Sequence, residues 1–144
     1  MDLGVKVGEE ARFVKTVTDA DFLLFCAVSG DHDPIHVSDT DAQAAGFEMR
    51  IAHGLLTVSI LSATESEMSR RIVARGVDAK PLSLGYEKIR FLKPVYPGDT
   101  LTAIYRIESI DSDNLRAIGD CRVETQNGEA VCVAKHVMKW VRPA

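Results

Sequence analysis

The chain has few aromatic residues and no excess of positive charge. Aromatic side chains make up 6% of its 144 residues, with one tryptophan, so aliphatic side chains must form most of the core. Acidic residues outnumber basic ones by 21 to 17, which leaves a formal net charge of -4. A nucleic-acid partner needs a basic surface to meet its phosphates. The composition therefore argues against nucleic-acid binding.

The sequence also lacks long apolar segments and the paired CxxC spacing of cysteines. No run of about 18 apolar residues occurs, so the sequence contains no candidate for a membrane-spanning helix. Its first residues, MDLG, do not begin a signal peptide. Cys26, Cys121 and Cys132 are odd in number and lack CxxC spacing, which favours reduced thiols. We therefore expect a cytoplasmic protein that does not bind a membrane.

The length favours a single domain over residues 1–144. A chain of this size buries roughly two-thirds of its unfolded surface, which is sufficient for one core. No linker, internal repeat or low-complexity segment interrupts the sequence.

The N-terminal half carries signals for one strand and three helices. Residues 9–17 are a plausible strand, and Thr18 with Asp21 resembles the start of a helix that ends at Gly30. Ser38 and Asp41 begin a second, short helix through residue 45. Apolar residues recur near a 3.6-residue period over residues 54–74, which predicts the longest helix.

A proline lies between the first two predicted helices. Pro34 disfavours helical geometry in the residue before it, so residues 31–36 are expected to form an ordered loop rather than a helix.

The C-terminal half changes to a period of two. Alternating residues predict strands over about 82–91, 101–107, 115–123 and 131–141, separated by turn-forming clusters such as PGD and QNG. Short connections favour antiparallel neighbours. The sequence therefore predicts an α+β fold in which an antiparallel sheet accompanies one long helix.

The residues suited to chemistry are concentrated between positions 29 and 54. Asp31 and His36 are five residues apart across a proline, and His53 with Gly54 directly precedes the longest predicted helix. A carboxylate, an imidazole and the amides of a helix N-terminus are sufficient to add water to a polarised double bond or to remove it.

Three ordered motifs in this chain resemble the MaoC-like, or R-specific enoyl-CoA hydratase, family. The first is FCAVSGDHDPIH from Phe25, the second is AQAAGFEMRIAHGL from Ala42, and the third is FLKPVYPGD from Phe91. One departure is Asp33, which stands where the family usually has asparagine. The resemblance covers most of the chain in the family's order.

The resemblance implies a hotdog fold, in which the antiparallel sheet wraps around the long helix and two copies pair as a homodimer. It also implies the reversible hydration of 2-enoyl thioesters to R-3-hydroxyacyl thioesters. The substrate would be carried by coenzyme A or an acyl carrier protein. No organic cofactor or metal is expected, because the thioester itself acidifies C2 and polarises C3.

The resemblance also assigns roles to individual residues. Asp31 and His36 match the family's catalytic pair, and the backbone amide of Gly54 matches its contact to the thioester oxygen. Ser62 matches a serine near the site in related hydratases, although it could equally be a small residue that eases packing. His53 is expected at the substrate-binding loop, where it forms hydrogen bonds rather than catalyses.

Other functions remain open on the sequence alone. An acyl-CoA thioesterase of the same fold would direct water at the carbonyl carbon, and a silent hotdog protein would bind an acyl thioester without turnover. Asp31, Asp33, His36 and His53 could in principle hold a divalent metal, but they lack a standard ligand spacing. His32 and His136 are expected to have no chemical role.

Overall fold

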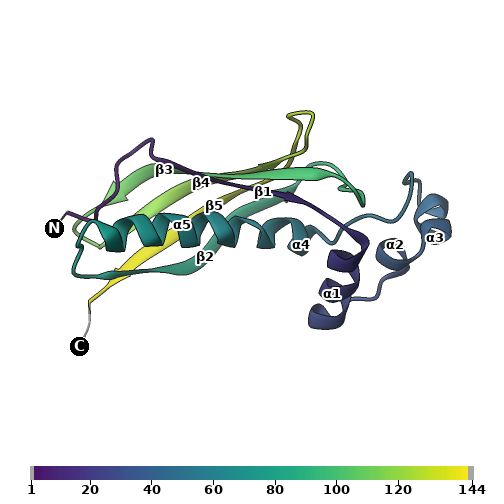
Figure 1. Ribbon diagram of the computed structural model, residues 1–144, viewed down its shortest axis with the longest axis horizontal. Helices are drawn as coiled ribbons and strands as arrows, with labels where there is room; N and C mark the ends of the chain where they lie inside the picture. Colours follow the sequence, from purple (N-terminus) through teal and green to yellow (C-terminus); the bar gives the residue numbers. More distant parts are fainter. Residues whose placement is uncertain (1, 143–144) are drawn as a thin grey trace.

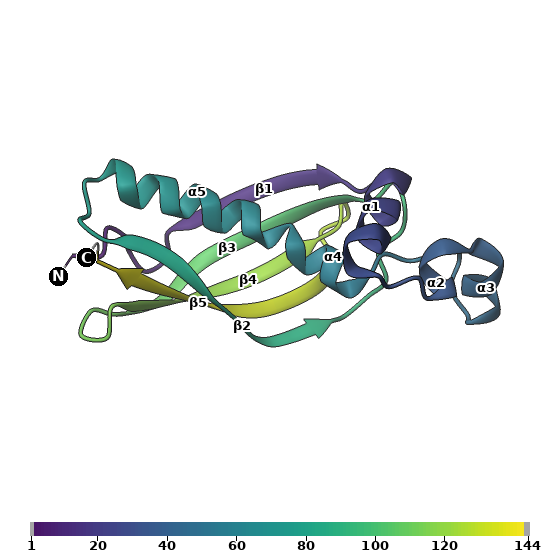
Figure 2. The ribbon, with the colours of Figure 1, turned by 90° about the horizontal axis from the view of Figure 1, so that it is seen from below.

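In the computed structural model, an antiparallel sheet of five strands packs against one long helix within the described residues 2–142 (Figures 1 and 2). The elements in chain order are β1 (Glu10–Thr16), α1 (Asp19–Ser29), α2 (Pro34–Val37), α3 (Asp39–Ala44), α4 (Gly54–Ser59), α5 (Leu61–Ala74), β2 (Lys80–Phe91), β3 (Thr100–Asp111), β4 (Arg116–Glu124) and β5 (Ala130–Val141).

The first helix begins and ends as its sequence predicts. The Thr18 side chain accepts a hydrogen bond from the Asp21 amide, and the Asp21 carboxylate accepts from the Thr18 amide at 2.8 Å. This reciprocal capping satisfies two amides that a helix start leaves without partners. Gly30 ends the helix with a φ of 75°, a left-handed conformation that glycine adopts at little steric cost.

The predicted loop over residues 31–36 is partly wrong, because Pro34 begins the short helix α2. Asp33 keeps the extended conformation that a residue before proline requires, and its side chain caps the helix by accepting from the Ile35 amide at 3.1 Å. Proline fits the first position of a helix, where its missing N–H has no intrahelical role. The proline therefore occupies the first position of α2 rather than preventing a helix.

The longest predicted helix is divided at Ile60 into α4 and α5. Ile60 itself keeps right-handed helical angles, so the two helices follow one another closely (Figure 1). The Ser59 hydroxyl donates to the Leu56 carbonyl at 2.7 Å. Such a side-chain bond offers the Leu56 carbonyl a partner outside the backbone ladder at the end of α4.

One face of α5 is buried against the sheet along its whole length. Leu61, Thr64, Met68 and Ile72 recur every three or four residues and are 0% exposed. Full burial of an aliphatic side chain contributes about 1.5–3 kcal/mol. The large buried side chains that the sheet contributes to the same core include Trp140, Tyr105, Leu101 and Ile107.

The strands have the order β1-β3-β4-β5-β2, and each pair is antiparallel as predicted. The strand β2 lies at one edge and changes register twice against β5, at Gly85 and again before Arg90. Gly85 and Lys88 have positive φ angles at these irregularities. β2 therefore bends along its length, as Figure 2 shows.

The helices α1, α2 and α3 project beyond the end of the sheet where α4 begins, far from the ends of the chain (Figures 1 and 2). Arg50 ties this region together, because its guanidinium binds Asp39 of α3 at 2.8 Å and also pairs with Asp19 of α1. Hydrogen bonds from the Arg50 amide and guanidinium lower the pKa of Asp39. Among residues 2–142, no helix is long and apolar enough to cross a membrane.

The contact between Gly119 and Tyr105 gives a test of this packing. A Cβ atom at Gly119 would lie 2.3 Å from Cζ of the fully buried Tyr105 ring. We expect Gly119→Ala to lower the free energy of unfolding by about 1–3 kcal/mol in urea titrations, because the core has no room to adjust. Ser112→Ala, in the exposed β3–β4 turn, is the control and should stay within about 0.5 kcal/mol. Equal stability of both variants would contradict the packing.

Candidate active site

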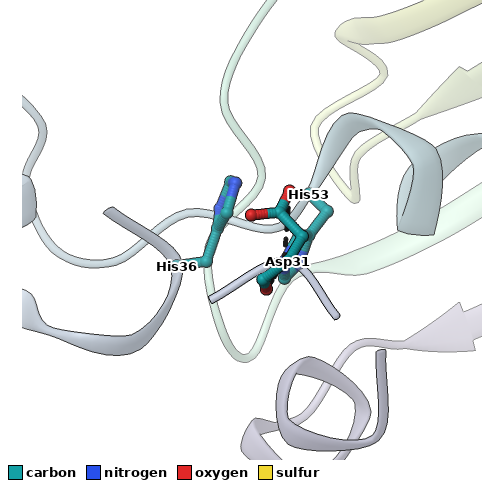
Figure 3. A group of neighbouring side chains, drawn as sticks. All are labelled: Asp31, His36 and His53. Atoms are coloured by element: carbon teal, nitrogen blue, oxygen red, sulfur yellow. Dashed lines mark hydrogen bonds and ion pairs between the residues drawn. The ribbon is translucent and has the colours of Figure 1, made fainter. Parts of the chain in front are cut away.

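Three backbone segments meet where α4 begins, and they are the segments that carry the three sequence motifs. The Ile51 amide donates to the Ile35 carbonyl at 3.0 Å, and the Ala52 amide donates to the Val95 carbonyl at 2.8 Å. These bonds link the first motif to the second and the second to the third. They bring Asp31, His36 and His53 together (Figure 3).

His36 projects from α2 and is almost completely buried. Its Nδ1 atom lies 2.8 Å from the carbonyl oxygen of Ile51. Because a carbonyl oxygen only accepts hydrogen bonds, Nδ1 must carry the proton in the neutral ring. The lone pair is then on Nε2, which is free to accept a proton from water.

His53 directly precedes α4 and is 2% exposed. Its Nε2 atom lies 2.9 Å from the Asp31 carbonyl oxygen, and its ring stacks on His36 with centroids 3.8 Å apart. The Phe25 ring also lies against the His53 ring, with their centroids 4.9 Å apart. The predicted hydrogen-bonding place of His53 in the loop agrees with this geometry. The His53 ring thus positions the Asp31 backbone through a hydrogen bond and orients the His36 ring by stacking on it.

The Asp31 side chain turns toward the two imidazoles (Figure 3). A carboxylate oxygen of Asp31 and one ring nitrogen from each histidine all lie within 4.8 Å of one another. One water molecule can bridge groups at such separations. The carboxylate is 50% exposed, so the burial that would favour an acid role for Asp31 is absent within this single chain.

Gly54 is the first residue of α4, where a backbone amide has no intrahelical acceptor. A Cβ atom there would lie 2.6 Å from the half-exposed Phe91 ring, so a larger residue at this position would require the ring to move. His36, Gly54 and Thr57 line a cavity of about 350 Å³. Its remaining walls are mainly apolar and include Phe47, Ile51, Phe91, Leu92 and Val131. We call this space the catalytic cavity.

Ser62 does not reach the catalytic cavity in this chain. It lies on the exposed side of α5 and lines a separate cavity with Glu65 and His136. The role suggested for Ser62 beside the catalytic pair therefore has no support within one protomer.

A larger cavity, of about 720 Å³, lies at the opposite end of α5. The N-terminal segment and Arg75 form it, and the Arg75 guanidinium is occupied by Glu9 at 2.8 Å and by the Gly4 carbonyl at 2.6 Å. The hydrogen bond from Arg75 lowers the pKa of Glu9. The residues lining this cavity include no histidine and no thiol, so it lacks a proton-transfer group for neutral pH.

Among the described residues, Asp31, His36 and His53 form a group whose potential ligand atoms are close enough to bind one metal ion. However, Nδ1 of His36 and Nε2 of His53 are already directed at carbonyl oxygens. Coordination would therefore depend on the remaining ring nitrogens, and Nδ1 of His53 is buried without a partner among residues 2–142.

A second polar group lies inside the fold, and no motif in the sequence indicates it. His136, expected to be a chemically silent strand residue, is 0% exposed and lies 3.3 Å from the Glu65 carboxylate. The three cysteines are free and buried, as expected of thiols. Burial raises the pKa of Cys121 to about 12 and that of Cys132 to about 11, so neither is a ready nucleophile.

Comparison with known proteins agrees with this fold and site. A family model described as the MaoC like domain matches residues 4–129. The chain therefore belongs to the MaoC-like domain family, and the family predicted from the three motifs is confirmed.

Particular relatives are similar over most of the chain. The (R)-specific enoyl-CoA hydratase of Rhodospirillum rubrum is 34% identical over 106 residues, which cover 74% of this chain and 68% of that protein. The 3-hydroxyacyl-thioester dehydratase Z of Mycobacterium tuberculosis is 30% identical over 142 residues, or 96% and 90% of the two chains. The structure of the (R)-hydratase of Aeromonas caviae matches with a TM-score of 0.80 at 29% identity, covering 96% of this chain and 98% of that one. This likeness confirms the predicted hotdog fold.

The tautomer of His36 can be measured directly. We expect its neutral ring to be protonated at Nδ1, because that atom faces the Ile51 carbonyl oxygen. Long-range ¹H–¹⁵N spectra distinguish the two ring nitrogens, and exposed His32 provides the internal control of a ring exchanging between tautomers. A neutral His36 protonated at Nε2 would show that the Ile51 contact does not orient the ring.

Proposed function

We propose that the protein is an R-specific enoyl-thioester hydratase, which reversibly converts a 2-enoyl thioester to a 3-hydroxyacyl thioester. The observation that carries this proposal is the meeting of Asp31 and His36 beside a cavity that contains the first amide of α4. The relatives named as hydratases and a dehydratase support the same reaction, and the names of the two (R)-specific hydratases support the R configuration.

His36 is the proton acceptor in this proposal. Its Nε2 lone pair takes a proton from water as the water oxygen bonds to C3 of the substrate. General-base catalysis of this kind contributes about 10²–10⁴-fold. The Ile51 carbonyl and the stacked His53 ring support the role, since they hold the imidazole in one tautomer and orientation.

Asp31 orients the attacking water from the other side. Its carboxylate accepts one hydrogen of the water while the other hydrogen faces His36, and the separation of their atoms leaves space for that water. Hydration adds both parts of water to the substrate, so the proton removed from oxygen is returned at C2 by this same pair.

The Gly54 amide stabilises the negative charge that develops on the thioester oxygen during attack. The absence of a Cβ atom lets the oxygen approach the backbone beside Phe91. One such donor contributes about 3 kcal/mol to lowering the barrier. The thioester supplies the remaining activation, so the proposed reaction uses no organic cofactor and no metal.

Coenzyme A or an acyl carrier protein is the proposed carrier of the acyl group, and the cytoplasm the proposed location. We also propose that the active form is a homodimer. The edge strand β2 exposes Leu82 and Leu84, and an exposed apolar edge is suited to pairing with a second sheet. A second copy would also cover part of the half-exposed Asp31 region.

The catalytic pair is tested by following the loss of conjugated enoyl-thioester absorbance with crotonyl-CoA. We expect Asp31→Asn and His36→Ala each to lower kcat/KM by about 10²–10⁴-fold, because each removes a proton-handling group. Asp33→Asn is the matched control. It makes the same chemical change two residues away, where asparagine also caps α2, and should preserve the rate and its pH optimum.

The same assay separates the other functions. Release of free thiol from the native protein would identify a thioesterase instead. Binding of enoyl-CoA substrates of several lengths without loss of absorbance would identify a non-catalytic binding protein. A large rate loss in Asp33→Asn equal to that of Asp31→Asn would show that the loop charge as a whole, rather than Asp31, carries the effect.

The Gly54 amide can be removed by proline, which the first position of a helix tolerates. Gly54→Ala is the control, because it retains the N–H while it also adds a Cβ atom toward Phe91. We expect kcat for Gly54→Pro to be a further 10²–10³-fold lower than for Gly54→Ala, roughly the effect of losing one oxyanion donor. Equal rates in the two variants would exclude the amide from catalysis.

A further inference from the structure

The last turn of α1 lies directly against His53. The Phe25 ring contacts the His53 ring with centroids 4.9 Å apart, and Cys26 Sγ lies 3.8 Å from His53 Nε2. Cys26 and, one turn earlier, Phe22 are each 2% exposed, so this side of the helix is packed into the protein. Closely packed side chains have little freedom to move. The end of α1 is therefore a fixed support beside the candidate active site.

Ser29 is the last residue of α1, and its hydroxyl makes two hydrogen bonds. Its Oγ atom donates to the Phe25 carbonyl at 2.6 Å and accepts from the Asp31 amide at 3.1 Å. A hydroxyl has one proton to donate and lone pairs that accept, so both bonds form at once. Gly30, with its left-handed φ of 75°, turns the chain and brings the Asp31 amide back to the helix end. Ser29 therefore ties Asp31 to the fixed end of α1.

The other polar groups of Asp31 are also held, with one exception. Its carbonyl oxygen faces His53 Nε2 at 2.9 Å, and its Oδ1 atom accepts from the Asp33 amide at 3.1 Å. The Oδ2 atom makes no hydrogen bond within residues 2–142 and lies 3.9 Å from His53 Nε2. Figure 3 shows the carboxylate on the side of the two imidazoles. The bonds of Asp31 therefore leave Oδ2 available to a water molecule at that place.

Packing contributes little to this arrangement, since the Asp31 side chain is 50% exposed. The hydrogen bonds of Asp31 determine where its carboxylate lies. Two of them come from His53 and Asp33, whereas the bond to Ser29 is the one that joins Asp31 to the end of α1. A displacement of about 1 Å can lower a rate by about 10²-fold when a reaction needs close alignment of its groups. The anchoring of Asp31 is therefore important for any reaction that uses its carboxylate.

We propose that Ser29 is a positioning residue for the hydration. Its hydroxyl anchors Asp31 to the end of α1 and so keeps Oδ2 directed at the water that His36 deprotonates. Ser29 does not line the catalytic cavity, so it acts through Asp31 and not on the substrate. This inference rests on the proposed hydratase function and adds to it a residue outside the cavity.

A purely structural role for Ser29 would have different consequences. The same two hydrogen bonds also complete the end of α1, so their loss lowers the stability of the helix end. Lower stability by itself does not change the kcat of the molecules that remain folded. The experiment therefore measures kcat, KM and the free energy of unfolding for each variant.

Ser29→Ala removes both hydrogen bonds of the hydroxyl. With crotonyl-CoA we expect kcat to fall about tenfold and KM to stay within about twofold of the native value, since the substrate does not contact Ser29. Ser29→Thr keeps a hydroxyl that can bond the same carbonyl and should restore kcat to within about twofold of native. Ser29→Val has the shape of threonine without the hydroxyl. It should match Ser29→Ala, and it serves if that variant does not fold.

Thr18→Ala is the control for stability. It removes a capping hydroxyl from the opposite end of the same helix, where Thr18 accepts from the Asp21 amide. Loss of such a cap lowers the free energy of unfolding, which urea titration measures. We expect kcat for this variant to stay within about twofold of native, because Asp31 keeps its anchor.

A double-mutant cycle identifies the residue through which Ser29 acts. In the Asp31→Asn background the carboxylate is already lost, so its position no longer matters to the rate. Adding Ser29→Ala there should change the remaining kcat by less than about twofold.

The outcomes are distinguishable. Native hydration of crotonyl-CoA with a near-native kcat for Ser29→Ala would overturn the positioning role and leave the hydratase proposal intact. An equal loss of kcat in Ser29→Thr or Thr18→Ala would overturn it too, as would an undiminished further loss in the Asp31→Asn background. Absence of hydration by the native protein with crotonyl-CoA and with every longer enoyl-CoA would overturn the hydratase proposal, and this inference with it.

Discussion

The burial of one face of α5 against the sheet is the contact on which the other features of this structure depend. Leu61, Met68 and Ile72 are completely covered, so the helix has one stable position over the strands. Because α4 precedes α5 on nearly the same course, this position also determines where the first amide of α4 lies. The close approach of Phe91 to Gly54 follows from it, and with it the place of the catalytic cavity.

Backbone carbonyl groups orient the imidazoles of the site. The Ile51 carbonyl holds His36 and the Asp31 carbonyl holds His53, so the position of each ring depends on a neighbouring loop rather than on its own element. The loops are in turn joined by the Ile51–Ile35 and Ala52–Val95 hydrogen bonds. A catalytic group held by such secondary contacts keeps one tautomer, which general-base chemistry requires. The three motifs therefore act as one unit although they lie far apart in the chain.

The buried polar group formed by Glu65 and His136 contrasts with this arrangement. Glu65 and His136 occupy the interface between helix and sheet, where apolar side chains would give greater stability. Tyr105, Ser83 and Glu65 satisfy both ring nitrogens of His136, yet one oxygen of Glu65 has no partner among the described residues. Leaving such an oxygen unpaired is unfavourable, so this polar group lowers the stability of the fold.

The sequence by itself determined the α+β class, the antiparallel strands, the capped first helix and the family, because hydrophobic period, turn residues and motifs are local properties of the chain. It also identified Asp31, His36, His53 and Gly54 as one neighbourhood. It did not reveal the start of α2 at Pro34, where the Asp33 side chain caps the helix, or the interruption of the longest helix at Ile60. Only the tertiary structure separated Ser62 from the catalytic cavity and joined Glu65 to His136 across 71 positions of sequence, because such contacts arise from packing a helix on a sheet and leave no periodic signal along the chain.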